Sequence, residues 1–126
     1  MSEDRATVQD PSNVVAAWVA DAASVSVADA YLGRRRSLRY PWSAAVEVIV
    51  NPGGDSEQRI VAAGQDISEG GMGLVCRRVL PAGAHVLLRE ADRQDECAWV
   101  PARVVHSVPS TGGYRVGLQF EFEKTQ

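Results

Sequence analysis

The sequence lacks the features that mark membrane, secreted or general nucleic-acid-binding proteins. No apolar run approaches the ~20 residues of a membrane-spanning helix, and Met1–Asp4 is acidic where a signal peptide would be basic. Two cysteines, Cys76 and Cys97, are too few for a disulfide framework, and we expect them to stay reduced. The net charge of −3 has the wrong sign for a general DNA binder. We therefore expect a cytoplasmic protein that binds neither DNA nor a membrane.

Residues typical of catalytic or metal sites are also scarce. The two histidines, His85 and His106, lie on strand patterns without an acidic or nucleophilic neighbour at a telling spacing. No Cys-x-x-Cys or His-x-x-x-His spacing suggests a metal. A lone histidine on a strand usually has a structural role. We expect the protein not to be an enzyme.

An N-terminal extension, residues 1–32, precedes the main domain. Residues 1–12 show no apolar period, and we expect them to be disordered. Asn13 could cap a helix at 13–23, with a weaker pattern continuing to about 32. Its apolar face carries Trp18, which we expect to pack against the domain or against a second copy. A homodimer through this helix is therefore one expectation.

From Ser43 onward the apolar residues follow a period of two. Six strands are predicted, at 43–50, 58–65, 74–77, 84–88, 98–104 and 114–122, separated by turns rich in Gly, Pro and Asp. No helical pattern lies between them, which indicates antiparallel pairing. One face of each strand is apolar, so we expect an all-β fold, a small six-stranded antiparallel β-barrel with a filled interior.

The densest positive charge lies in residues 33–42, just before the first strand. Four arginines fall within six positions, and no acidic residue occurs between Asp29 and Glu47. A guanidinium fork binds phosphate through paired donors and can stack on a base, so this loop is a candidate anion clamp. A solvated segment without a ligand is the alternative. Tyr40 and Trp42 could stack on a base, although a tryptophan at a barrel entrance is more often core.

A second motif, Asp66-Ile67-Ser68-Glu69-Gly70-Gly71, ends the second predicted strand. Alternation places Asp66 and Ser68 on one face, and the glycines that follow could let a ligand approach closely. The same residue types also build ordinary turns, and that alternative stays open here.

The two motifs together make the chain similar to the PilZ domain family. That family is marked by an Arg-x-x-x-Arg loop before a barrel and a later Asp/Asn-x-Ser-x-x-Gly motif. Here Arg35 and Arg39, with Arg34 in front of them, match the first motif, and Asp66, Ser68 and Gly71 match the second. The resemblance covers about residues 33–122, and the domain is taken as 33–126.

The resemblance implies a receptor for the bacterial second messenger cyclic di-GMP. Arg35 and Arg39 would grip phosphate or guanine, Asp66 would accept from the guanine N1–H and amino group, Ser68 would add a hydrogen bond and Gly71 would leave space for the ring. Arg34 could reach a second, stacked ligand molecule, which would make the ligand a dimer. Arg103, Arg115 and Gln119 face outward by alternation and could border the site. No cofactor is expected.

The implied mechanism is ordering of the arginine loop on binding, which would re-aim residues 13–32 and create a surface for an unidentified downstream protein. The alternative function is a PilZ-like protein-interaction module that does not bind nucleotide. Some members of the family lack the arginines and act as adaptors, whereas this chain keeps both motifs.

Overall fold

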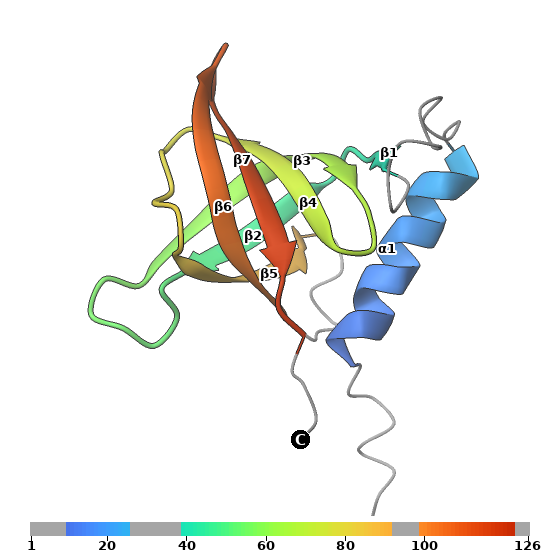
Figure 1. Ribbon diagram of the computed structural model, residues 1–126, viewed down its shortest axis with the longest axis horizontal. Helices are drawn as coiled ribbons and strands as arrows, with labels where there is room; N and C mark the ends of the chain where they lie inside the picture. Colours follow the sequence, from blue (N-terminus) through green and yellow to red (C-terminus); the bar gives the residue numbers. More distant parts are fainter. Residues whose placement is uncertain (1–9, 26–38, 92–98, 123–126) are drawn as a thin grey trace, which may run out of the picture.

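The structure is a computed structural model that describes residues 10–25, 39–91 and 99–122. Within these ranges one helix and seven strands are found (Figure 1). The helix is α1 (Pro11–Val25). The strands are β1 (Tyr40–Pro41), β2 (Ala45–Val50), β3 (Gln58–Ile67), β4 (Gly71–Cys76), β5 (His85–Glu90), β6 (Val100–Ser110) and β7 (Gly113–Phe120).

Six of the strands form a closed barrel. They follow the hydrogen-bonded order β3-β2-β5-β6-β7-β4, and β4 pairs with β3 to complete the ring. All of these pairings are antiparallel. The predicted six-stranded antiparallel barrel is therefore confirmed. The additional strand β1 has two residues and pairs with the end of β3, beyond the residues that pair with β2.

Alternating burial along the strands explains why the sequence closes into a barrel. In β2 the side chains of Val46 and Val48 are fully buried, while Glu47 between them is half-buried on the outer face. The same alternation in β7 buries Val116 and Leu118. Ring closure leaves each of the six strands paired on both sides, which removes exposed edges.

Several strand ends differ from the prediction. β4 begins at Gly71 rather than Leu74, because the hydrogen bond from the Ser68 amide to the Gly71 carbonyl starts the β3–β4 ladder at the bend itself. β6 runs on to Ser110, into the predicted turn, because a register shift in the strand lets its pairing with β7 continue. The predicted start of this strand at residue 98 lies outside the described residues.

Helix α1 begins two residues earlier than predicted. Asp10 caps it, since its Oδ1 accepts from the Ser12 amide at 3.1 Å and its carbonyl accepts from the amides of Asn13 and Val14. Pro11 fills the first helical position, where a missing N–H costs nothing. Asn13 as the cap and disorder through residue 12 were therefore wrong. Residues 1–9 and 26–32 lie outside the described part of the chain.

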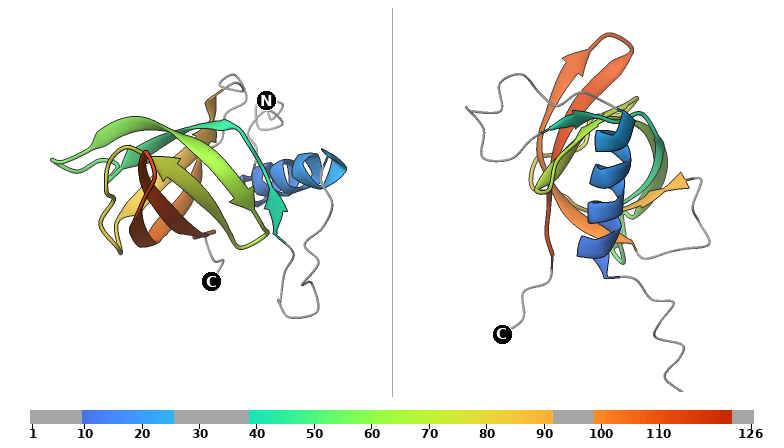
Figure 2. Two further views of the ribbon diagram at one scale, coloured as in Figure 1. Left: turned by 90° about the horizontal axis from the view of Figure 1, so that it is seen from above. Right: turned by 90° about the vertical axis from the view of Figure 1, so that its right-hand side faces the viewer.

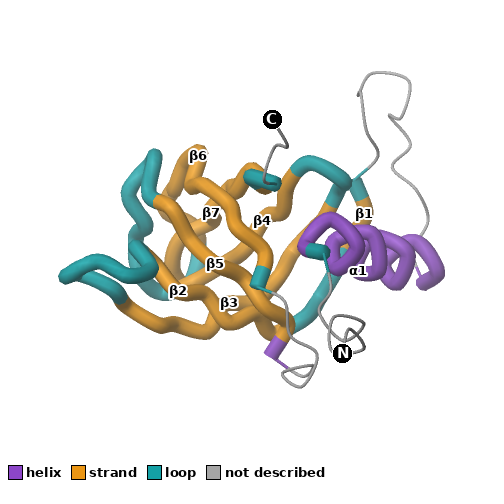
Figure 3. The backbone as a smooth tube through the Cα atoms, turned by 90° about the horizontal axis from the view of Figure 1, so that it is seen from below, coloured by secondary structure: helices purple, strands orange, loops and turns teal. Residues whose placement is uncertain are grey.

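Helix α1 lies across one open end of the barrel (Figure 2), and the long β2–β3 turn lies at the opposite end (Figure 3). Three residues of α1, Val15, Trp18 and Ala22, belong to the same buried cluster as the barrel interior. The ring of Trp18 stacks on Trp42, with 5.3 Å between centroids. Stacking of this kind contributes about 0.5–1.5 kcal/mol beyond area burial. Trp18 thus packs against its own domain, and Trp42 is a core residue.

Candidate functional site

An open groove of about 1010 Å³ runs over the outer wall formed by β1, β3, β4, β6 and β7. Its lining includes two arginines, one carboxylate, one histidine and three strand glycines. These residues are Arg39, Arg115, Asp66, His106, Gly64, Gly73 and Gly117. The wall therefore offers cationic forks and one strong hydrogen-bond acceptor above a floor of small residues.

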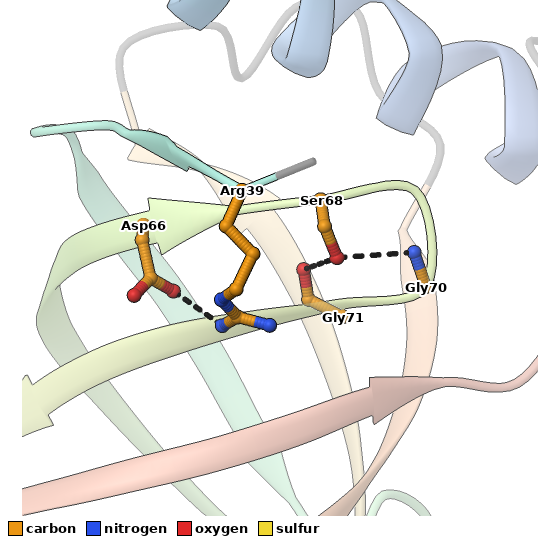
Figure 4. A network of polar contacts seen from close by, with 5 residues as sticks. All are labelled: Arg39, Asp66, Ser68, Gly70 and Gly71. Atoms are coloured by element: carbon orange, nitrogen blue, oxygen red, sulfur yellow. Dashed lines mark hydrogen bonds and ion pairs between the residues drawn. The ribbon is translucent and has the colours of Figure 1, made fainter. Parts of the chain in front are cut away.

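The closest polar contact in the groove joins Arg39 to Asp66. Arg39 Nη2 donates to Asp66 Oδ1 at 2.6 Å, and the two side chains are 35% and 32% exposed (Figure 4). The pairing of β1 with β3 makes this contact, because it sets Pro41 opposite Asp66 and so brings the preceding Arg39 onto the same wall. Residues 27 positions apart in sequence thus form one site.

A bulge in β3 turns Asp66 outward. Ala62 and Gly64 are buried, so uninterrupted alternation would bury residue 66 as well. The register with β4 shifts between Gly64 and Asp66, and Ile67 becomes the next buried residue. The Asp66 carboxylate then lies over Gly73, where a Cβ would stand only 2.9 Å from Oδ1. A bulge beside a functional side chain is a common way of re-aiming it.

Ser68 and Gly71 hold the bend between β3 and β4. Ser68 is 3% exposed, and its Oγ accepts from the Gly70 amide at 3.3 Å and donates to the Gly71 carbonyl at 3.4 Å (Figure 4). A Cβ on Gly71 would collide with the backbone carbonyl of Leu118 on β7. Both residues therefore hold the bend through contacts within the protein, and their contacts to a ligand stay predictions.

The other predicted site residues divide into three groups. Arg34 and Arg35 lie outside the described residues, so their positions stay predictions. Arg115 lines the groove from β7. Arg103 and Gln119 are not among the residues that line it: Arg103 Nη2 donates to Gln119 Oε1 at 3.3 Å, and Arg103 Nε lies 3.8 Å from Glu121 Oε2.

Comparison with known proteins decides the family. The PilZ domain model matches residues 33–126, which is most of the chain and includes both motifs. The chain belongs to the PilZ domain family.

Among solved structures, this PilZ chain resembles MrkH of K. pneumonia in complex with c-di-GMP, with a TM-score of 0.52 and 17% sequence identity. The match covers 72% of this chain and 45% of the MrkH chain, so the two share the barrel but differ in extent. At this identity the likeness is one of fold. No curated protein matches the chain.

Among the residues of this PilZ groove that sequence reasoning missed, three lie side by side on β4, β7 and β6. Gly73 and Gly117 are paired across β4 and β7, and His106 follows on β6 opposite Gly117. The two glycines could have indicated a site, because a glycine weakens the interior of a strand and often marks a place where a ligand or another backbone approaches closely. His106 was interpreted as a structural strand residue, whereas it is exposed and lines the groove.

Other chemistry finds little support in the described part of the chain. Within it, no group of three His, Cys, Asp or Glu residues could hold a metal ion. Cys76 is buried, and burial raises the pKa of its thiol, so it stays protonated and packs as a small apolar residue. Cys97 lies outside the described residues. None of the helices described is both long enough and apolar enough to cross a bilayer.

Proposed function

We propose that this PilZ domain is a receptor that binds cyclic di-GMP in the groove lined by Arg39 and Asp66. The observation that carries the proposal is their contact, which brings the end of the arginine loop and the acidic motif to the same wall. The fold shared with MrkH, which is solved with c-di-GMP, supports the same ligand class.

The residues suit the chemistry of the ligand, which carries two phosphates and two guanines. Arg39 supplies a planar fork that can bind phosphate or guanine O6 and N7 through paired donors. The Asp66 carboxylate accepts hydrogen bonds, so it complements the guanine N1–H and amino group. Arg115 adds a second cation at the groove. Adenine presents an acceptor at N1 and would leave the carboxylate facing another acceptor.

Binding must remake the contact between Arg39 and Asp66. One nitrogen of the guanidinium is engaged with one carboxylate oxygen, so ligand groups would share or replace this contact. Two or three charge-assisted contacts at ~1.5–3 kcal/mol each, less the cost of ordering the loop, suit an affinity on the order of micromolar. Such an affinity allows the signal to be released.

The effect of ligand binding in the groove would be transmitted to a partner through helix α1. Arg39 is three residues before Trp42, whose amide donates to the Gln65 carbonyl at 2.9 Å and whose ring stacks on Trp18. A ligand that changes the position of Arg39 within the groove therefore acts on the segment between β1 and β2, which carries the docking site of α1. A downstream protein would recognise the new position of α1.

Isothermal titration calorimetry with cyclic di-GMP tests the proposal, with cyclic di-AMP as the comparison ligand. We expect a micromolar cyclic di-GMP complex and at least tenfold weaker binding of cyclic di-AMP. Arg39→Ala and Asp66→Ala should each weaken cyclic di-GMP binding about ten- to hundredfold. No heat with the wild type, together with unchanged amide signals of residues 33–42, would favour the adaptor alternative and defeat the receptor.

A further inference from the structure

A second side chain lies across the groove from Asp66 in the same transverse row. Asp66 on β3 is paired with Gly73 on β4, Gly73 is paired with Gly117 on β7, and Gly117 is paired with His106 on β6. The two glycines thus form a floor that is bounded by a carboxylate on one side and an imidazole on the other.

His106 faces the groove because of a bulge that mirrors the one before Asp66. Val104 is buried, so regular alternation would place residue 106 inside the barrel. The β6–β7 register shifts between Val104 and His106, and His106 becomes exposed. The same register shift stands between Gly64 and Asp66 on β3. Two bulges on two strands therefore turn two side chains onto the same floor, as bulges beside functional sites often do.

The imidazole of His106 lies with its face on Gly117. A Cβ built on Gly117 would stand 2.6 Å from Nε2, 2.7 Å from Cε1 and 3.3 Å from Cδ2. A position in the ring plane beyond Nε2 or Cε1 would be much farther from Cδ2 than this, so the three distances place the Cβ over the ring face. One face of the ring therefore lies against the glycine, and the side chain is exposed and lines the groove.

We propose that His106 is the stacking platform for a purine base of the ligand. The inference rests on the proposed function and assigns the base a place on the wall. Asp66 lies over Gly73 and His106 lies over Gly117. The Cα atoms of these two paired glycines are ~5 Å apart. A guanine stacked on the face of the ring that points away from Gly117 would turn its hydrogen-bonding edge toward Asp66, while Arg39 and Arg115 remain at the groove for phosphate.

Substitutions at His106 separate stacking from the other contributions. His106→Ala removes the platform, and we expect cyclic di-GMP affinity to fall about five- to tenfold, the lower end for base–aromatic stacking. His106→Phe keeps a flat ring and should bind within about twofold of wild type. His85→Ala is the matched control, because His85 is an exposed strand histidine, paired with Glu121 at 3.0 Å and not among the groove residues. It should leave affinity unchanged.

Gly117→Ala provides a second test that retains the imidazole. The added Cβ would force the His106 ring away from the wall, which a flexible side chain can accept without unfolding the barrel. Affinity should fall as in His106→Ala, and His106→Ala combined with Gly117→Ala should cost little more than either change alone. Thermal unfolding checks that each variant is folded.

The outcomes distinguish the platform from the receptor itself. Wild-type binding with an unchanged affinity for folded His106→Ala overturns the platform and leaves the receptor standing. Equal losses in His106→Ala and His106→Phe overturn stacking, because the flat ring then gives no rescue. A wild type that does not bind cyclic di-GMP overturns both proposals.

Discussion

Arg39→Lys separates the charge of Arg39 from the shape of its guanidinium. A single nitrogen of Arg39, Nη2, contacts Asp66 Oδ1 at 2.6 Å. A lysine ammonium can make one contact of this kind. A ligand phosphate or guanine, by contrast, is matched by the planar fork, which lysine lacks. The substitution should therefore spare the fold and weaken the ligand complex.

The effects of Arg39→Lys on stability and on ligand affinity should differ in size. The Arg39 and Asp66 side chains are about one-third exposed, so solvent screens their pair and limits its contribution to about 0.2–1 kcal/mol. Arg39→Lys should lower the free energy of unfolding by less than that, a shift in Tm of at most ~4 °C. Loss of a paired, charge-assisted contact to the ligand costs ~1.5–3 kcal/mol, so cyclic di-GMP affinity should fall about ten- to hundredfold.

Calorimetric titration and thermal unfolding of the same preparations measure the two effects. Arg78→Lys is the matched control: Arg78 Nη1 donates to Gln58 Oε1 at 2.9 Å, and Arg78 is exposed and does not line the groove. It should change neither quantity. Binding by Arg39→Lys within twofold of wild type would refute the role of the fork. A loss of several kcal/mol in stability would show that the pair belongs to the structural framework.

Three further predictions concern the barrel and its helix. Trp18→Ala should lower the free energy of unfolding in urea by about 2–4 kcal/mol, because it removes a buried ring; a loss below ~1 kcal/mol would mean that α1 is not docked. Gly71→Ala should destabilise the barrel by ~2 kcal/mol or more, whereas Gly70→Ala, with open space around its Cβ, should have little effect. In a Cys97→Ser background, the thiol of Cys76 should react slowly with a thiol reagent at neutral pH and quickly in denaturant, because burial raises its pKa and shields it; equal rates would contradict its burial.

The barrel could be predicted because an alternating pattern recurs from strand to strand. Val46 and Val48 flank Glu47 in β2, and Val116 and Leu118 alternate with Arg115, Gly117 and Gln119 in β7. Since the period of two is fixed by the pleat, this pattern determines which face is buried without knowledge of the partners. The start of α1, by contrast, was predicted wrongly, because Asp10 and Asn13 are both good caps and only the backbone geometry chooses between them.

The sequence could predict only those residues of the candidate site that belong to one of the two motifs. The spacing of the two motifs singled out Arg39 and Asp66, and the β1–β3 pairing then brings them into contact. His106 was missed because a bulge leaves no mark in an alternating pattern: the residue follows Val104 at the spacing of a buried position. The burial of Ser68 likewise depends on how the bend closes, which a motif of turn residues does not specify.

The most direct test of the central claim is a titration of the ¹⁵N-labelled protein with cyclic di-GMP, followed by amide chemical shifts. The groove lies over β3, β4, β6 and β7, while β2 and β5 form the opposite part of the ring. We expect saturable shifts at Arg39, Asp66, Gly73 and Gly117, with little change around Glu47 on β2. Shifts centred on β2 and β5, or no shifts at millimolar ligand, would contradict the account.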